Sequence, residues 1–321
     1  MPLVGTLSRL RAVAVVALGT VAGVVAPGFG ESIAPFTTLL VAGLVFTSLH
    51  GVGVAGRSGR RAGAFVATVL VTSYLVVPAL VALVAPAALP AGATAALLVV
   101  VAAPTTAGSA LVWTDLSRGD GFLATAGALG SLLVAPVAVP AVFSTVAAPG
   151  ATVPVASVAR TLALVVGAGG AAAWLVPDGA VSERTTDRIA LLAVFLLLYA
   201  SIAGAEPSTV PAGRLAVVAA CALGTMAVGG VVATAGRWVG PLSGSEAVAL
   251  LYASTLKNLG VSLAVAAALG VERAAVVVVA FYAAQQLASG ALASALAGVG
   301  RGHGRTGLAP STPFGTDRES R

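Results

Sequence analysis

The sequence predicts an all-α polytopic membrane protein with ten transmembrane helices in two inverted repeats of five. Three observations predict this fold class. Of the 321 residues, 58% are hydrophobic and only 9% are charged, a composition that excludes a water-soluble globular domain. Apolar runs long enough to cross a bilayer recur along the chain, and the positive charges are distributed unevenly between alternate loops.

The apolar runs define the predicted helices. A helix needs about 20 mostly apolar residues to cross the hydrocarbon core. Ten runs meet this need: 10–28, 33–51, 64–86, 91–113, 121–147, 156–176, 187–205, 212–236, 245–270 and 273–298. The first follows Arg9 and Arg11, as a signal peptide would, but further spans come after it, so we expect a retained helix. The polar residues 299–321 are predicted to be a disordered cytoplasmic tail.

The arginines predict the orientation. With the N-terminus inside, thirteen arginines lie in cytoplasmic loops or tails, and only Arg160, Arg214 and Arg273 lie on the opposite side. We therefore expect both termini in the cytoplasm. Low lysine with high alanine, valine, glycine and arginine suggests a GC-rich prokaryote, and hence its plasma membrane. The arginines that give the net charge of +6 lie mostly in loops and tails, where they determine the orientation in the membrane, so no nucleic-acid partner is predicted.

The ten spans divide into residues 1–150 and 151–298, each with five spans. Because five is odd, the second half would enter the membrane with the opposite orientation, as in an inverted repeat. The fourth span of each half has a polar interruption: "APTTAGSALVW" at 103–113 and "ASTLKNLGVSL" at 253–263. Paired interrupted helices indicate a transporter's binding site, because broken backbone exposes groups that a cavity or ligand must satisfy. The candidate residues are Thr105, Thr106, Ser109, Ser254, Thr255, Lys257 and Asn258.

Other chemistries lack the residues they need. The single cysteine, Cys221, and the two histidines, His50 and His303, are too few for a metal cluster or a disulfide framework. No catalytic pair lies at membrane depth, and no ATP-binding loop is present. We therefore expect neither an enzyme nor a bound cofactor.

Lys257 is the only lysine of the chain and lies in an apolar run. From Glu246, about ten helical residues cover roughly 15 Å, half the hydrocarbon thickness, so Lys257 is expected near the midplane. The acidic residues all fall at helix ends or in loops, so its ammonium has no obvious counter-ion. Three hypotheses remain open: a direct part in substrate or proton handling, a permanently charged staple between helices, and snorkelling to a membrane surface.

Three stretches resemble the bile acid:sodium symporter superfamily, which includes the arsenical-resistance exporters. They are "LLVAGLVFTSLHGVGV" followed by "SYLVVPAL", the stretch "APTTAGSALVWTDLSRGDGFLATAGALGSLLVAPVAVP", and "STLKNLGVSLAVAAALG". Tyr74 and Pro78 fall on the tyrosine and proline of a family pattern. The resemblance implies a panel domain of helices 1, 2, 6 and 7, and a core domain of helices 3, 4, 5, 8, 9 and 10, with helices 4 and 9 broken where they cross.

The departures from the family pattern concern sodium. Ala253 stands where the sodium-binding glutamate belongs, Lys257 where a glutamine belongs, and Ser73 where a further glutamine is expected. Ala128 and Leu132 fall where hydroxyl ligands would lie. A sodium site needs several oxygen ligands, and a fixed ammonium repels the ion by roughly 4 kcal/mol at about 4 Å and a dielectric of about 20. We expect transport without the family's usual sodium coupling.

The arsenite branch is disfavoured, because its cysteine corresponds here to Thr105 or Thr106.

The sequence therefore predicts a secondary transporter that moves a small or amphipathic organic anion by alternating access. Lys257 would replace the sodium ion, bonded to carbonyls at the breaks and to hydroxyls such as Thr106, Ser109 and Ser254. If it released and regained a proton, it would couple transport to protons. Ser73 and Gln286, with neighbouring Gln285, complete the candidate site. The alternatives are a cation/proton exchanger, weakened by the lack of a buried aspartate, and a chromophore receptor with a Lys257 Schiff base.

Overall fold

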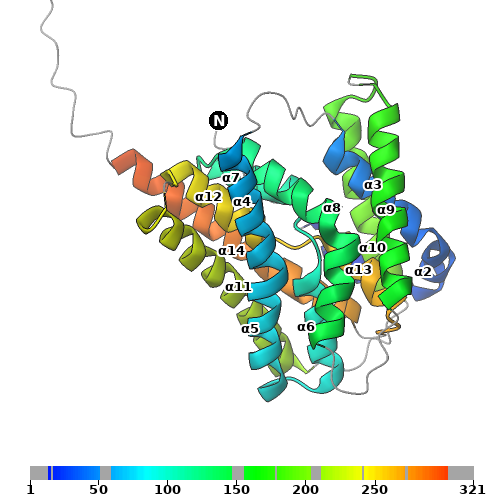
Figure 1. The fold of residues 1–321 in the computed structure, drawn as a ribbon. Helices are drawn as coiled ribbons and strands as arrows, with labels where there is room; N and C mark the ends of the chain where they lie inside the picture. Colours follow the sequence, from blue (N-terminus) through cyan, green and yellow to red (C-terminus); the bar gives the residue numbers. More distant parts are fainter. Residues whose placement is uncertain are drawn as a thin grey trace, which may run out of the picture.

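The computed structural model describes residues 14–50, 59–146, 155–203 and 211–302, apart from positions 16, 178, 241, 272 and 273. Within these ranges the chain is almost entirely helical (Figure 1). The extended pairing in them is one isolated bridge, between Thr105 and Lys257.

Residues 17–25 are helical, and the helices after them follow the predicted runs except for α2, which lies mostly between the first two runs. They are α2 (Pro27–Ile33), α3 (Thr37–Leu49), α4 (Arg60–Val71), α5 (Val77–Val84), α6 (Ala91–Ala102), α7 (Ala107–Leu116), α8 (Gly121–Val146), α9 (Val155–Leu175), α10 (Glu183–Ala203), α11 (Ala212–Trp238), α12 (Gly244–Thr255), α13 (Leu259–Ala268) and α14 (Ala274–Gly302).

Several helices have the length and composition of membrane spans. In the described part of the chain, six helical segments qualify: Arg60–Ala87, Gly121–Thr145, Ala156–Leu175, Arg184–Ala203, Ala212–Trp238 and Ala274–Leu296. The segments Thr37–Leu49, Ala91–Ala102 and Leu259–Ala268 are shorter apolar helices. The protein is therefore a multi-pass membrane protein.

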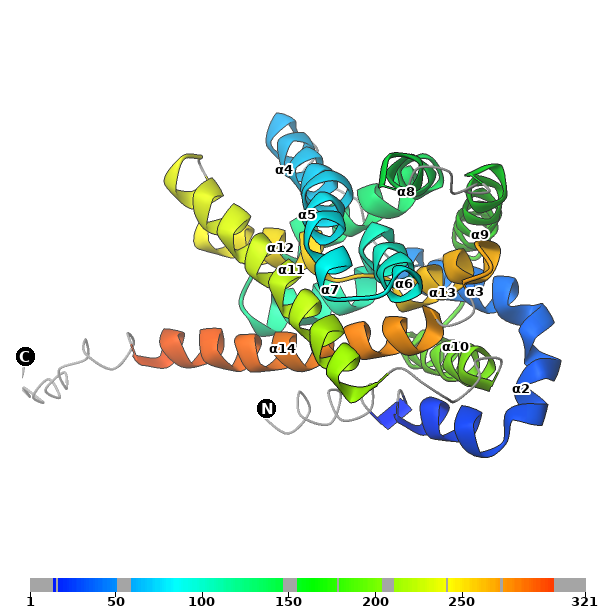
Figure 2. The same cartoon turned by 90° about the horizontal axis from the view of Figure 1, so that it is seen from below.

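The helices form two groups, which Figure 2 shows side by side. In one group α3 packs against α9 and α10, and α10 packs against α2. In the other, α12 packs against α8, α11 and α7, while α14 packs against α11 and α6. The two groups meet where α8 packs against α9. Helix α13 extends into the first group and meets α3 and α9. A Cβ atom on Gly260, in its first turn, would lie 2.8 Å from Leu44 Cδ1 of α3, so a larger residue here would require the Leu44 side chain to move.

Two long apolar runs are interrupted, each for a local reason. Helix α6 ends at Ala102 because Pro104 follows, and the residue before a proline is driven out of the helical region. Ala103 is accordingly extended, with φ −63° and ψ 151°. The second interruption follows α12, where Leu256 is extended, and it ends at Asn258, whose Oδ1 accepts a hydrogen bond from Val261 N and caps α13.

A third run changes helical geometry without a break. Between α4 and α5, residues Thr72–Val76 form a π-helical turn, in which Val77 N donates to Thr72 O. Pro78 lies in the first turn of α5 and has no N–H. The π turn inserts one extra residue into a helix that is otherwise continuous through the membrane.

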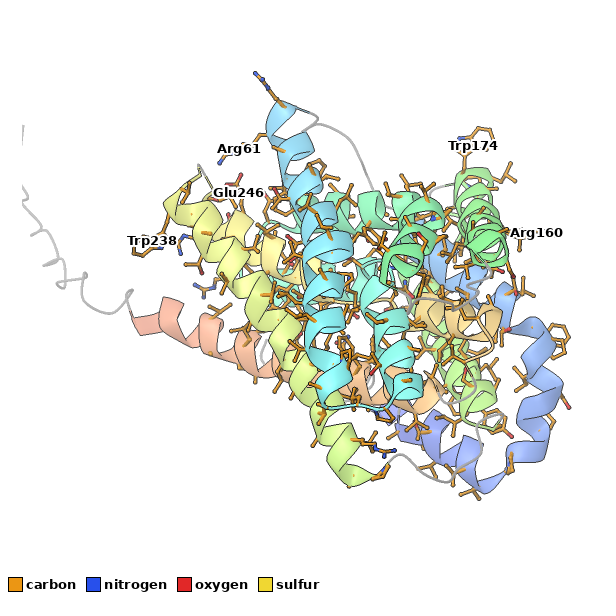
Figure 3. The ribbon with its side chains drawn as sticks, turned by 60° about the horizontal axis from the view of Figure 1, so that its bottom comes forward. Arg61, Arg160, Trp174, Trp238 and Glu246 are labelled. Carbon is orange, nitrogen blue, oxygen red and sulfur yellow. The ribbon has the colours of Figure 1, made fainter. Side chains whose placement is uncertain are left out.

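The start of α12 is tied to its neighbours at one end of the molecule. Ser243 and Glu246 form a reciprocal capping box at its N-terminus. Arg61 of α4 donates to Glu246 at 2.7 Å. Both side chains are labelled in Figure 3.

Two tryptophans lie at the C-terminal ends of α9 and α11: Trp174 is 84% exposed and Trp238 is 87% exposed. Exposed tryptophans at helix ends are typical of residues at a membrane–water interface.

Candidate functional site at the helix crossing

The two interruptions cross and pair with each other. Thr106 N donates to Leu256 O at 3.1 Å, and Asn258 N donates to Pro104 O at 2.8 Å. These are the hydrogen bonds of a short antiparallel ladder. Each break therefore satisfies backbone groups that the other exposes, as buried backbone requires.

Side chains from the surrounding helices fix the crossing. Thr105 N donates to Ser131 Oγ of α8 at 2.8 Å, and Thr105 Oγ1 donates to Ala253 O at 2.7 Å. Gln285 of α14 donates through Nε2 to Thr255 O at 2.7 Å. All five of these residues are buried. The C-terminal end of α12 is thus held on one side by Thr105, in the segment before α7, and on the other side by Gln285 of α14.

Neighbouring residues of each break face opposite sides. Extended backbone directs successive side chains to alternate faces. Thr105 and Lys257 are accordingly enclosed within the protein, while Thr106 and Asn258 line a cavity. The crossing therefore divides the predicted site residues into two sets. Thr105 and Lys257 belong to the enclosed set, and Thr106 and Asn258 belong to the cavity set.

Lys257 dominates the enclosed set. Its side chain is only 2% exposed, and its Nζ donates to Ser73 O of the π turn at 3.2 Å. The Nζ also lies 5.8 Å from the centroid of the Tyr74 ring, within the range of a cation–π interaction. Its backbone N donates to Gln285 Oε1 at 3.2 Å.

The π turn explains why the Ser73 carbonyl can accept from a side chain. In a regular α-helix, Ser73 O would accept from the N–H of residue 77. Here Val77 N donates to Thr72 O instead, and the next residue, Pro78, has no N–H to offer. The carbonyl is released from the helix ladder, and the ammonium of Lys257 occupies the acceptor site that this creates.

Ser73 and Tyr74 bind further groups of the crossing. Ser73 Oγ donates to Ser254 O at 2.8 Å, and Tyr74 OH donates to Ser131 O at 2.7 Å. We call Lys257, Ser73, Tyr74 and Ser131 the ammonium cluster. Its members come from three separate segments, and no carboxylate among the described residues is paired with the lysine.

This geometry differs from the expected partners of Lys257. The ammonium contacts the carbonyl of Ser73, whereas the sequence suggested carbonyls at the two breaks and hydroxyls of Thr106, Ser109 and Ser254. Thr106 and Ser109 line the cavity instead. Ser254 Oγ donates to Leu250 O of its own helix, and the ammonium donates to Ser73 O.

Thr255 and Ser254 contribute through their backbone. Thr255 Oγ1 donates to Leu251 O, and both hydroxyls are thus bonded back to the preceding turn of α12. Their carbonyls, in contrast, accept from Gln285 and Ser73. These two residues anchor the end of α12 and do not line the cavity.

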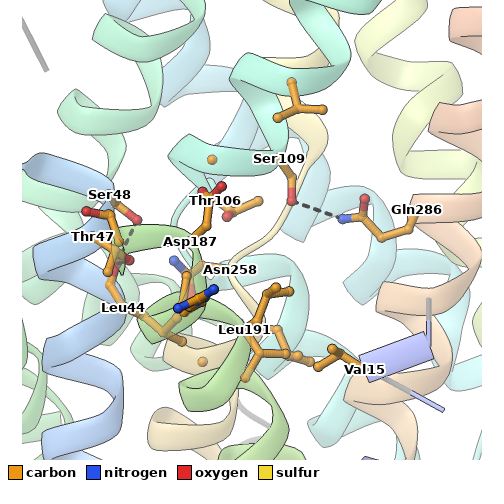
Figure 4. A pocket seen from close by; sticks show the side chains of 18 of the residues that line it. Val15, Leu44, Thr47, Ser48, Thr106, Ser109, Asp187, Leu191, Asn258 and Gln286 are labelled. Carbon is orange, nitrogen blue, oxygen red and sulfur yellow. Dashed lines mark hydrogen bonds between the residues drawn. The ribbon is translucent and has the colours of Figure 1, made fainter. Parts of the chain in front are cut away.

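The cavity has a volume of about 810 Å³ and lies between the two helix groups (Figure 4). Its walls come from α3, α7, α10, α13 and α14. The predicted site residues that line it are Thr106, Ser109, Asn258 and Gln286. Pockets of this size accommodate ligands as large as a drug molecule.

Asn258 presents a donor to this cavity. Its side chain is 6% exposed, and its Oδ1 is occupied by the cap of α13. The amide NH₂ must therefore point away from Val261 N, and it has no hydrogen-bond partner among the described residues. An NH₂ that faces a cavity without a protein partner is a site for an oxygen atom of a ligand.

A second polar group lies on the wall formed by α7 and α14. Gln286 Nε2 donates to Ser109 Oγ at 3.4 Å, the contact drawn as a dashed line in Figure 4, and Trp113 Nε1 donates to Gln286 Oε1 at 2.7 Å. These bonds fix the orientation of the amide against the indole.

Several residues of the site were missed by the sequence analysis. Ser131 accepts from Tyr74 OH through its carbonyl and from Thr105 N through its hydroxyl, but one serine in an apolar helix gives no signal of its own. Arg184, Asp187 and Arg188 line the cavity, although their positions in the sequence indicated only a charged loop end. A helical spacing of i, i+3 and i+4 was the available signal for these three.

Comparison with known families finds one match. Residues 57–207 match the model of the sodium bile acid symporter family. The matched segment includes the π turn, the first interruption and α10. Comparison with the curated proteins found no match.

Proposed function

The match of residues 57–207 supports membership of the bile acid:sodium symporter superfamily, and on this premise we propose that the chain is a secondary active transporter of a small or amphipathic organic anion. The superfamily consists of membrane transporters, and the apolar helices suit that role. The observation that carries the proposal in this chain is the paired crossing of two interrupted helices beside a cavity.

The proposed architecture has ten transmembrane helices in two inverted repeats, residues 1–150 and 151–298, with both termini in the cytoplasm of a prokaryote. Helices α6 and α7 are then the broken fourth span, and α12 and α13 the broken ninth. The group containing α3, α9 and α10 acts as the panel, and the group containing α8, α12 and α14 acts as the core. Movement between them exposes the crossing to each side in turn.

The ammonium of Lys257 takes the place of the sodium ion in this proposal. It lies on a carbonyl that a π turn and Pro78 leave without a backbone donor, which is the kind of acceptor a cation binds. A second cation in the same place would be repelled by roughly 4 kcal/mol at about 4 Å and a dielectric of about 20. Transport would thus proceed without sodium.

Proton coupling follows if Lys257 exchanges its proton during the cycle. The ammonium has no described counter-ion, so its charge is held by one carbonyl and one aromatic ring. A movement that separated α12 from the π turn would remove both contacts and leave a buried charge that favours loss of a proton. The same Lys257 that replaces sodium would then supply the coupling ion.

The test is transport in proteoliposomes, with a panel of organic anions from 3-phenylpropionate to cholate. We expect the wild type to transport at equal rates when potassium replaces sodium, and to respond to a pH gradient. Lys257→Gln and Lys257→Ala should slow transport about tenfold or more, the kinetic equivalent of one charge-assisted hydrogen bond, and should abolish the response to pH.

Arg160→Gln is the matched control, because it removes a cation on α9 that contacts neither the cavity nor the ammonium cluster. It should leave rate and pH response unchanged. Stimulation of the wild type by sodium, or Lys257 variants with normal rates and a normal pH response, would contradict the proposed role of Lys257.

A further inference from the structure

The first two turns of α10 place charged side chains on the cavity. Arg184, Thr186, Asp187 and Arg188 all line it. Arg184, Asp187 and Arg188 are spaced i, i+3 and i+4, and residues at this spacing share one face of a helix. We call Arg184, Asp187 and Arg188 the α10 rim.

The rim and the deeper wall differ in exposure and polarity. The three rim side chains are exposed, whereas Asn258 and Leu259 at the crossing are buried. Between these two levels α10 lines the cavity with the apolar Leu191 and Val194. Along this helix the cavity therefore runs from a charged rim, past an apolar wall, to a polar floor at the crossing.

The positive charge that a ligand can reach lies at the rim. Lys257, for which the sequence left open a direct part in substrate handling, is enclosed on the other side of the crossing and does not line the cavity. Among the described lining residues, the cations are Arg184 and Arg188, and the anion is Asp187. Together these side chains carry one net positive charge.

The rim charges are available for binding. No hydrogen bond or ion pair joins Arg184, Asp187 or Arg188 to another side chain in the described ranges. An arginine presents five N–H donors in a planar fork and binds a carboxylate or sulfonate through two of them. Two arginines at i and i+4 can receive one such head group between them.

We propose that the α10 rim binds the head group of the transported anion and selects monoanions over dianions. This inference rests on the proposed transport function and assigns the charge recognition of that same cavity. Arg184 and Arg188 hold the head group, while Asp187 repels a second negative charge. The body of the substrate lies along Leu191 and Val194, and the NH₂ of Asn258 binds an uncharged oxygen, such as a hydroxyl, at the floor.

The test is calorimetric binding to the full-length protein in nanodiscs, with three matched probes: 3-phenylpropionate, its neutral amide and the dianion phenylsuccinate. We expect the wild type to prefer 3-phenylpropionate. Replacing both rim arginines (Arg184→Gln with Arg188→Gln) should weaken its binding about tenfold or more, as expected for loss of charge-assisted hydrogen bonds. Binding of the amide should change less than about twofold, because no charge is lost from that contact.

Asp187→Asn tests the selection against dianions. Removing the carboxylate should strengthen phenylsuccinate binding by about fivefold to tenfold, since a like charge at the rim is removed. Arg214→Gln is the matched control: it removes an exposed arginine of α11 that does not line the cavity, and all three affinities should stay at the wild-type values.

The outcomes separate this inference from the proposed function. If the wild type binds 3-phenylpropionate and the double variant binds it equally well, the rim assignment is wrong and the transport proposal stands. An Asp187→Asn variant that still rejects phenylsuccinate overturns the selection step. If the wild type does not bind 3-phenylpropionate and transports none of the organic anions of the proteoliposome panel, the organic-anion function fails, and this inference fails with it.

Discussion

At the scale of single residues, Lys257 and Asn258 show how two neighbours can have unrelated roles. Both lie in the second interruption, and the extended backbone there sends their side chains to opposite sides. Lys257 holds the π turn through Ser73 O, while Asn258 caps α13 and faces the cavity. A substitution at either residue should therefore affect a different property of the protein.

Asn258 allows its two roles to be separated. Asn258→Ala should lower the free energy of unfolding by about 0.5–2 kcal/mol through loss of the cap, and should weaken cholate binding through loss of the NH₂. Asn258→Ser retains a capping hydroxyl, so we expect nearly normal stability with weak cholate binding. Thermal unfolding and calorimetric titration measure the two effects.

The control for this pair is Ser243→Ala, which removes a cap from α12 far from the cavity. It should lower stability and leave cholate binding unchanged. Binding of 3-phenylpropionate should be normal in all three variants, because this probe has no hydroxyl for the floor. Equal loss of cholate binding in Ser243→Ala would show that stability, and not the NH₂, controls affinity.

At the scale of elements, the π turn between α4 and α5 is the feature that prepares a cation site. A π turn shifts the hydrogen-bond register by one residue, and Pro78 prevents the next turn from restoring a donor to Ser73 O. The result is a carbonyl within the membrane that needs a partner from elsewhere in the chain. Lys257 supplies that partner from a segment 184 residues away.

Pro78→Ala tests this account of the π turn. Alanine restores an N–H that can donate to Ser73 O or to Tyr74 O, so it competes with the ammonium for its acceptor. We expect unchanged or higher thermal stability, because a helix-interior proline costs about 3 kcal/mol, together with slower transport. Pro140→Ala, at a proline inside α8, should not slow transport, and a Pro78 variant with normal transport would argue against the acceptor role.

The elements also show which features a sequence can predict. Apolar length and charge gave the helical runs, and Pro104 and the polar stretch around Asn258 gave the two interruptions. The π turn was not predicted, because it lies inside a continuous apolar run whose composition does not distinguish it from the α-helices on either side. The division of the candidate residues into two sets was also missed, because the interruptions were predicted without their conformation: the backbone there is extended, and successive side chains alternate between two faces.

At the scale of the whole molecule, the cavity lies between two groups of helices whose relative movement would change its access. Arg184 and Arg188 lie at its exposed rim, and the predicted topology assigns both arginines to the cytoplasmic side. The described conformation should then be open to the cytoplasm and closed to the exterior.

Thiol labelling can test this orientation. In a Cys221→Ser background, Ser109→Cys should react with a membrane-impermeant thiol reagent from the cytoplasmic side and much more slowly from outside, because Ser109 lines the cavity. Bound cholate should protect it. Ser262→Cys is completely buried in α13 and should stay unreactive from both sides. Labelling of Ser109→Cys from the exterior alone would reverse the assigned orientation.

The reciprocal bonding of the two interruptions has a consequence for biogenesis. Pro104 emerges from the ribosome long before Asn258, so the first interruption must enter the bilayer while the strand that completes it has not yet been synthesised. Its peptide groups would stay hydrated, or be shielded by the insertion machinery, until the later segment arrives. Folding of the N-terminal half is thus completed only when the C-terminal half has been synthesised. A prematurely terminated chain would be a natural substrate for quality-control proteolysis.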